Sequence, residues 1–469
     1  MLFDVAAILT SVTLGPVAEA FGVHEIHAYS TTQSQAVDVP RFLPDAQASV
    51  PGAQIAVPDV QVSLPNPQAF VPDAPPLPFI GPEPAEGAAD QVHGARLLDQ
   101  LALLPSSNIA AWVANNPESI AGILASPPPA HDVTLWWRSL GSDSKLALRN
   151  ATPQLIGNLD GVPYTIRDVA NRSVLNSTMA SLEDVIESES GRTVVENAKQ
   201  QLHMLQSISK ALVGDGYGST NKTLMSLEVA GQGRAAIVIG DLRTADYVSY
   251  LVPGMFFTIE NQMGDWVDAA SRLHDEELSW LALLGTDDGP GTDRTVATVA
   301  WIGYHTPNLT NVGGIENAYE GRDALAGAIQ GLQSLRTGDE PYISVIAHSY
   351  GSTAALMALT EYDFEVDALA MVGSPGSPAK SVDQLHVRDG NVFVGEAAWD
   401  PIPNSSYFGS DPGAASYGAK PMGVDGGTDP LTRLRLASST GHNEYFSPGT
   451  ESMRNFALIA IGEGQYVTQ

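Results

Sequence analysis

From Leu224 onward the chain alternates short apolar runs with helical stretches, and this alternation constrains the fold more than any other feature. The apolar runs are rich in Val, Ile and Ala without strict polar alternation, which is typical of strands covered on both faces. The runs expected to form strands are 227–230, 235–239, 247–252, 296–301, 342–347, 368–372, 392–395 and 433–436. Strands separated by helices predict an α/β fold with a mostly parallel central sheet over residues 224–469.

Helical periodicity dominates residues 91–223 instead. Residues 192–213 place Val, Ala, Leu and Ile at spacings of three and four, so that one face of a helix is apolar. The other helices expected here cover 97–104, 107–114, 117–124, 163–176 and 179–187, and the later part carries helices at 260–284 and 322–335. We therefore expect a helical N-terminal region that packs on the domain formed by 224–469.

Two further segments precede the helical region. Residues 38–90 carry recurrent proline, which fixes φ and removes backbone donors, so they form a linker or a strap. Residues 1–37 contain an apolar run at 5–17 that is too short to span a bilayer, followed by a small-residue cleavage pattern at 18–20. A basic start is missing, so an amphipathic helix is the alternative to a signal peptide. We expect no transmembrane span, and a secreted or cell-surface location rather than a cytoplasmic one.

Charge and cysteine content exclude several classes of function. The chain has 23 basic and 53 acidic residues, a net charge of −30, which repels phosphate backbones and anionic lipid headgroups. Nucleic acid is therefore not expected as a partner. Because the chain has 0 cysteines, thiolate nucleophiles and Cys-ligated metal sites are excluded. His24 and His27 lack the spacing of a zinc-protease helix, so neither a metal nor an organic cofactor is expected.

The sequence Ala347-His348-Ser349-Tyr350-Gly351 lies between an apolar strand and a helix of small residues. It resembles the G-x-S-x-G nucleophile elbow of α/β-hydrolases, with Ala347 in place of the first glycine. Such a turn needs small neighbours because it holds the serine in a strained conformation. A serine at this point can also serve only as a helix cap. The strand and helix on either side favour Ser349 as a nucleophile.

A serine hydroxyl needs a base, which in turn needs an orienting acid, and in this fold they follow the serine in the order acid, then histidine. Only His386 and His442 lie downstream of Ser349. His386 precedes a strand, at the wrong end of the sheet, so we predict His442 as the general base. Asp400 follows the strand at 392–395 and is predicted as the acid. The rival carboxylates are Glu396, Asp411 and Glu444.

Acyl transfer also needs hydrogen-bond donors for the developing oxyanion. We expect the backbone N–H of Tyr350, which follows the nucleophile, and that of Met255, in the loop after the strand at 247–252. Gly254 permits the close backbone approach that this loop needs. The residues predicted to line the substrate site are Gly254, Phe256, His305 and Ser374. Ordinary turns and core packing are the alternatives for these four positions.

Several segments taken together resemble an uncharacterised actinobacterial α/β-hydrolase family. They are WWRSLGSDSKLAL, IGNLDGVPYTIRDVANRSVL, GDLRTADYVSYLVPGM, VAWIGYHTP, AHSYGS, VGSPG, WDPI and GHNEYF, and they span residues 136–446. The resemblance implies an α/β-hydrolase fold with Ser349, Asp400 and His442 as a catalytic triad, and no settled substrate. The proline-rich N-terminal part lies outside it.

The function predicted from these features is that of a serine hydrolase that cleaves an ester through an acyl-enzyme, as a carboxylesterase or a lipase-like enzyme does. The expected substrate is a small-molecule or lipid ester. A peptidase or amidase is the enzymatic alternative, because the same triad cleaves amides. A surface or binding protein built on a hydrolase scaffold is the non-catalytic alternative.

Overall fold

The apolar runs of the second half form one sheet of eight strands in the order β1-β2-β4-β3-β5-β6-β7-β8. The computed structural model describes residues 87–188, 191–213, 221–285, 294–308 and 310–469. The strands are β1 (Lys222–Glu228), β2 (Arg234–Gly240), β3 (Tyr247–Val252), β4 (Val296–Ile302), β5 (Tyr342–His348), β6 (Ala368–Val372), β7 (Val392–Gly395) and β8 (Lys420–Pro421).

The sheet is mostly parallel, as predicted. All pairs from β4 through β8 are parallel, whereas β2 runs antiparallel to both β1 and β4. Every residue of β4 and β6 is buried, which agrees with strands covered on both faces. The predicted α/β-hydrolase fold, with a helical region before the sheet, is confirmed by this topology.

Three strands differ from the prediction. β1 covers Lys222–Glu228 rather than 227–230, so the predicted range overlaps it at its last two residues only. The run predicted at 433–436 contributes only β10 (Arg435–Leu436), which pairs with β9 (Gly427–Thr428) in a separate two-stranded sheet. The eighth strand of the central sheet is instead β8, which has two exposed residues. An exposed edge strand of this length has no apolar run to reveal it in a sequence.

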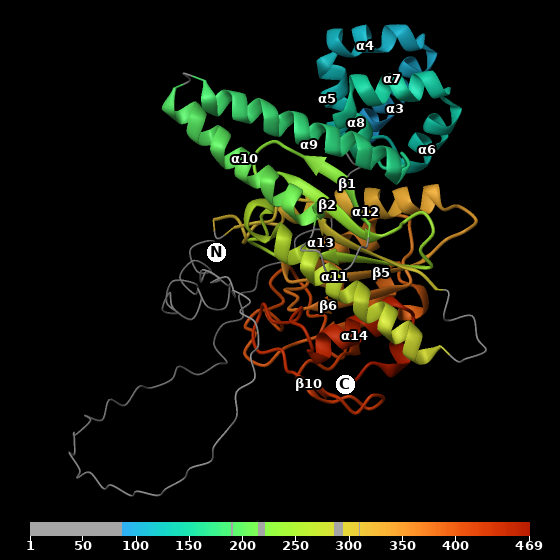
Figure 1. The fold of residues 1–469 in the computed structure, drawn as a ribbon. Helices are drawn as coiled ribbons and strands as arrows, with labels where there is room; N and C mark the ends of the chain where they lie inside the picture. Colours follow the sequence, from blue (N-terminus) through green and yellow to red (C-terminus); the bar gives the residue numbers. More distant parts are fainter. Residues whose placement is uncertain (1–86, 189–190, 214–220, 286–293, 309) are drawn as a thin grey trace, which may run out of the picture. The chain divides into compact units, whose positions relative to one another are not determined.

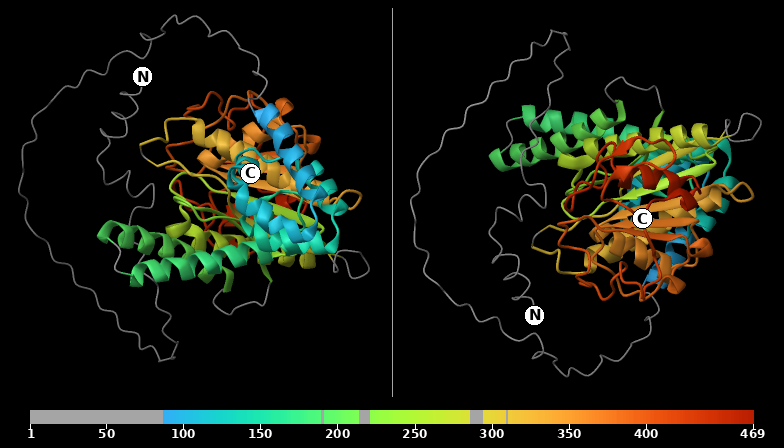
Figure 2. Two further views of the ribbon diagram at one scale, coloured as in Figure 1. Left: turned by 90° about the horizontal axis from the view of Figure 1, so that it is seen from above. Right: turned by 90° about the horizontal axis from the view of Figure 1, so that it is seen from below.

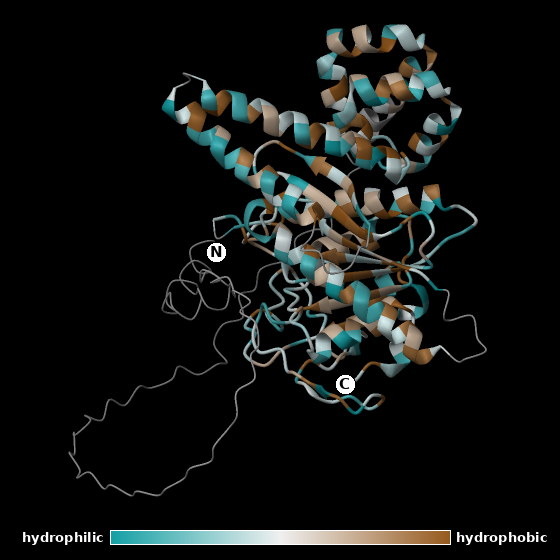
Figure 3. Cartoon of the chain, in the orientation of Figure 1, coloured by the Kyte–Doolittle hydropathy of each residue, from teal (hydrophilic) through white to brown (hydrophobic). Residues whose placement is uncertain are grey.

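Helices cover both faces of the sheet (Figure 1). One face carries α10 (Arg192–Val213), α11 (Ile259–Leu284) and α14 (Glu451–Ala460), whose apolar residues share a core with the sheet. The other face carries α12 (Glu316–Leu335) and α13 (Tyr350–Glu361). The views from above and below show the sheet between these layers (Figure 2). The strands are mostly hydrophobic, coloured brown in Figure 3, whereas the helices are mixed in hydropathy.

The helical N-terminal region has a small core of its own around Trp136 and Trp137. Its elements are α3 (Gly87–Leu103), α4 (Ser106–Asn115), α5 (Pro117–Ala125), α6 (Ala130–Ser139), α7 (Ser142–Ala151), α8 (Pro153–Asn158) and α9 (Tyr164–Glu187). The two helices predicted over 163–187 are one helix, α9, because no Pro or Gly interrupts the stretch between them. Helices α6, α7, α8 and α14 were not predicted.

Side chains of this region bind the outer edge of the sheet. Asn158 accepts from the Leu227 N–H at 2.9 Å and donates to the Leu227 carbonyl at 2.8 Å, as a neighbouring strand does. Leu224 is the next residue of β1 whose N–H and carbonyl face away from the sheet. Asp168 accepts from its N–H, and Asn171 donates to its carbonyl. The helices thus cover a strand edge that otherwise presents unpaired backbone groups.

The segment predicted as signal-like (1–37) and residues 38–86 of the segment predicted as proline-rich (38–90) lie outside the described residues. Residues 87–90 are helical instead, because they belong to α3. The described chain starts with α3 at Gly87. Among the helices that the structure describes, none combines the length and the apolar character needed to cross a bilayer.

Candidate active site

The chain turns sharply at Ser349, between β5 and α13. Its backbone has φ 53° and ψ −131°, which is strained for a residue with a side chain. The Ser349 N–H bonds to the Val372 carbonyl at 2.9 Å, which ties the turn to β6. The following helix approaches so closely that a Cβ on Gly351 would lie 2.2 Å from the Pro253 carbonyl oxygen. Small residues are therefore required here, as the sequence pattern indicated.

The Ser349 hydroxyl meets the imidazole of His442. Ser349 Oγ and His442 Nε2 lie 2.7 Å apart, and both residues are almost fully buried. His442 lies in the loop between β10 and α14, and joins Ser349 across 93 residues of sequence. His386, by contrast, lies before β7 with its Nδ1 at 2.7 Å from the Tyr362 carbonyl oxygen. The structure thus brings to the serine the histidine that the chain-order rule selected.

Asp400 lies on the far side of the imidazole. Both of its carboxylate oxygens are 2.9 Å from His442 Nδ1, and its side chain is fully shielded from solvent. Burial raises the pKa of Asp400, but hydrogen bonds from His442 and Tyr445 outweigh burial, so the pKa lies below its ordinary value. An ionised carboxylate only accepts, so Nδ1 carries a proton and Nε2 accepts the serine proton.

The rival carboxylates bind elsewhere. Glu396 accepts from Asn404 at 3.3 Å, Asp411 accepts from the Gly413 N–H at 3.0 Å, and Glu444 accepts from Thr440 at 2.7 Å. A hydroxyl, an imidazole and a carboxylate joined in this order can activate the hydroxyl as a nucleophile.

The loop after β3 lies against the serine. A Cβ on Gly254 would come within 2.6 Å of Ser349 Cβ, so glycine is needed for this approach. Two hydrogen bonds hold the loop: Tyr304 Oη donates to the Pro253 carbonyl at 2.8 Å, and the Phe256 N–H donates to the Pro307 carbonyl at 3.0 Å. Met255 is the residue after Gly254, so its amide lies next in the chain to backbone that contacts Ser349.

Three predicted substrate-site residues have structural partners of their own. Phe256 adopts φ 63° within the loop after β3, where its N–H bonds to the Pro307 carbonyl. His305 Nδ1 is 2.8 Å from Glu320, and this hydrogen bond raises the pKa of His305 above its usual value. Ser374 is buried and accepts from Ser352 Oγ at 2.7 Å. His305 is thus engaged by α12 rather than joined to the serine.

Two buried side chains beside the histidine were not predicted from the sequence. His348 donates from Nε2 to the His442 carbonyl at 2.7 Å, and Tyr445 donates from Oη to Asp400 at 2.7 Å. Burial lowers the pKa of His348 to about 3, so its ring is neutral. Both residues stand in motifs that were noted for their neighbours, AHSYG and GHNEYF. Only the folded arrangement shows what they touch.

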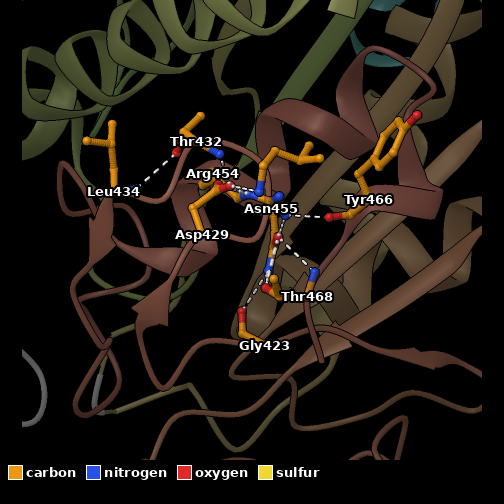
Figure 4. A network of polar contacts seen from close by, with 9 residues as sticks. Gly423, Asp429, Thr432, Leu434, Arg454, Asn455, Tyr466 and Thr468 are labelled. Atoms are coloured by element: carbon orange, nitrogen blue, oxygen red, sulfur yellow. Dashed lines mark hydrogen bonds and ion pairs between the residues drawn. The ribbon is translucent and has the colours of Figure 1, made fainter.

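A buried polar network fastens the segment that leads to His442 (Figure 4). Arg454 of α14 donates to Asp429 at 2.8 Å and also bonds to the Tyr466 carbonyl. Asn455 donates to the Gly423 carbonyl and to Thr468 Oγ1, both at 2.9 Å. The network ties this segment and the C-terminal tail to α14, so the loop that carries His442 starts from a fixed base.

Comparison with known proteins agrees with this fold. The family model described as "Alpha/beta hydrolase" matches residues 228–410. Residues 228–410 are thus similar in sequence to the alpha/beta hydrolases. The alpha/beta hydrolase match includes Ser349 and Asp400 and ends before His442.

Two relatives of the chain are uncharacterised proteins from two strains of Mycobacterium tuberculosis. Each is 29% identical over 391 residues, which cover 72% of this chain and 57% of the relative. The match thus spans little more than half of the length of these relatives.

Solved structures similar to the chain include a dienelactone hydrolase from Anabaena variabilis, with 12% identity and a TM-score of 0.32 over 54% of this chain and all of that one (100%). An S-formylglutathione hydrolase from Agrobacterium tumefaciens has 11% identity and a TM-score of 0.30, over 53% of this chain and 96% of that one. The family match and the strand order support an α/β-hydrolase fold, and these distant similarities carry no argument.

Proposed function

We propose that the chain hydrolyses a carboxylic ester through an acyl-enzyme, with Ser349 as nucleophile, His442 as general base and Asp400 as orienting acid. The observation that carries this proposal is the continuous contact from Ser349 Oγ through the imidazole of His442 to Asp400, at 2.7 Å and 2.9 Å. The strained backbone of Ser349 supports it, because strain of this kind clusters at functional sites.

In the first half of the reaction, Ser349 Oγ attacks the carbonyl carbon of the ester while its proton passes to His442 Nε2. The imidazolium that forms is stabilised by the carboxylate of Asp400. The carbonyl oxygen becomes an oxyanion, for which the N–H groups of Tyr350 and Met255 are the proposed donors. Tyr350 is the first residue of α13, so its N–H has no acceptor within that helix.

Collapse of the tetrahedral intermediate transfers the proton from His442 to the departing alcohol and leaves the acyl group on Ser349. Water then attacks the acyl carbon with His442 again as base. The bond to Ser349 Oγ breaks as His442 returns the proton to that oxygen, and the carboxylic acid is released. We propose an ester rather than an amide because an alcohol leaves with less protonation than an amine needs. The substrate class is a small-molecule or lipid ester, without nucleic acid as a partner and without a metal or organic cofactor.

A fluorophosphonate probe tests the nucleophile directly. Wild-type protein should be labelled at Ser349, and Ser349→Ala should abolish labelling together with hydrolysis of p-nitrophenyl esters. The matched control is Ser405→Ala, which removes an exposed serine from the loop after Asp400 and should label like the wild type. Labelling that persists in Ser349→Ala refutes the assignment. Comparison of p-nitrophenyl esters of increasing acyl length with the matching anilide then separates an esterase from an amidase.

A further inference from the structure

Tyr445 forms a hydrogen bond with Asp400, the acid of the proposed triad. It is fully buried, and its ring packs in the core that α11 and α14 share with the sheet. Its hydroxyl lies between two polar groups, the Ala397 N–H at 2.9 Å and Asp400 Oδ2 at 2.7 Å. The amide can only donate, so the hydroxyl accepts from it and must direct its own proton to Asp400.

This proton completes the hydrogen bonding of the Asp400 carboxylate. Oδ1 accepts from the Ile402 N–H at 3.0 Å, Oδ2 accepts from Tyr445, and both oxygens face His442 Nδ1. Each oxygen thus has one fixed donor besides the imidazole. Because the two donors bind different oxygens, rotation of the carboxylate about its Cβ–Cγ bond breaks at least one of these hydrogen bonds.

We propose that Tyr445 is a positioning residue for the Asp400–His442 pair: it fixes the plane of the carboxylate and withdraws negative charge from it, and so sets the orientation and basicity of the imidazole. This inference rests on the proposed function. Tyr445 reaches the reaction only through Asp400, since its hydroxyl is already engaged on both sides.

Two other titratable groups act on this pair. His348, from the end of β5, donates to the His442 carbonyl, and its ring centroid lies 4.6 Å from that of His442. It is neutral, so it holds the backbone of His442 without competing for the charge of Asp400. Glu396, at the end of β7, acts on Asp400 and Tyr445 by charge alone. Loss of the Tyr445 hydroxyl leaves both of these groups in place, so its effect is separable from theirs.

The test variant is Tyr445→Phe, which keeps the ring and removes the hydroxyl. With one donor fewer, the carboxylate attracts the imidazolium proton more strongly, so the acid limb of the pH profile of kcat/KM should move to higher pH by about half a unit. We expect kcat on a p-nitrophenyl ester to fall about tenfold and KM to stay within about twofold, because a lost hydrogen bond to a charged group acts in the transition state.

The matched control is Tyr417→Phe. Tyr417 is also a buried tyrosine, and its hydroxyl has no hydrogen-bond partner in the part of the chain that the structure describes. This change should leave kcat, KM and the acid limb as in the wild type. A difluorotyrosine at position 445 keeps every contact and makes the phenol a stronger donor, so it should move the acid limb to lower pH.

The downfield proton resonance of His442 Nδ1–H provides a readout that needs no turnover. In Tyr445→Phe it should move or be lost through faster exchange with water, whereas in Tyr417→Phe it should stay in place. An unchanged resonance and an unchanged acid limb in folded Tyr445→Phe overturn the role of Tyr445 alone. Absence of fluorophosphonate labelling in the wild type instead overturns the proposed function, whatever the resonance shows.

Discussion

At the scale of single residues, the site consists of side chains whose hydrogen-bonding capacity is largely used by one another. Asp400 is the central example, because it accepts from an imidazole, a hydroxyl and a backbone amide while its side chain is fully shielded from water. Burial of a carboxylate is costly unless it is hydrogen-bonded in this way. The charge is therefore held where it stabilises an adjacent imidazolium, and its removal should affect catalysis much more than folding.

Replacement of the carboxylate by an amide tests this expectation. Asp400→Asn keeps the size of the side chain but presents an N–H that favours the wrong tautomer of His442, so Nε2 can no longer take the serine proton. We expect kcat to fall by ~10³ to 10⁴, the scale known for this change in a serine protease. Asp411→Asn is the control for loss of one negative charge nearby. A loss of less than about tenfold in Asp400→Asn would show that another group orients the histidine.

At the scale of elements, the turn from β5 into α13 is held against the loop after β3. A Cβ on Gly351 would lie 2.2 Å from the Pro253 carbonyl oxygen and 2.9 Å from its carbon, and both are backbone atoms. Tyr304 donates a hydrogen bond to that carbonyl, so movement of the loop breaks this hydrogen bond. Any side chain at 351 must therefore move the loop that carries the proposed Met255 donor.

Gly351→Ala should reduce kcat/KM by roughly 100-fold, because displacement of one oxyanion donor by about an ångström has an effect of this size. The rate of fluorophosphonate labelling and the melting temperature should fall with it. Gly264→Ala is the control: a Cβ there meets nothing within 4 Å, and alanine favours the helix α11 by about 0.5 to 1 kcal/mol. Full activity in Gly351→Ala would mean that the loop contributes no donor.

The sequence predicted the elements that have continuous apolar patterns. The bounds of β3, β6, β7 and α10 agree with the expected ranges, since each is a buried run or a regular apolar stripe. The short strand β8 gave no such pattern, and of the run predicted at 433–436 only the two residues of β10 form a strand. In the candidate site, chain order led to the prediction of His442, and the place after a strand led to that of Asp400. The contact between Tyr445 and Asp400 spans 45 residues, and no local pattern encodes it.

At the scale of the whole molecule, a buried polar cluster lies between α11 and the centre of the sheet. Glu277 of α11 accepts from Ser249 of β3 at 2.6 Å and from Thr298 of β4 at 3.0 Å, and Ser344 of β5 donates to Ser249. Glu277 is wholly buried, and burial raises its pKa to about 8. Hydrogen bonds between polar residues at the centre of three strands fix the register of these strands, which the apolar pattern alone does not do.

This carboxyl makes the stability of the fold depend on pH. Its folded-state pKa lies above the unfolded value, so the folded chain binds the extra proton; its contribution is complete below about pH 4.5 and is lost as pH rises to about 8. Glu277→Gln is neutral at every pH. We expect the free energy of unfolding of the variant to lack a decline on the order of 1 kcal/mol per pH unit that the wild type shows in this window. Denaturant unfolding at steps of about one pH unit between about pH 5 and 8 measures this free energy.

The control is Glu183→Gln, which neutralises an exposed glutamate of α9. Its free energy of unfolding should decline with pH as that of the wild type does. Parallel curves for wild type and Glu277→Gln would mean that Glu277 stays ionised in the folded protein.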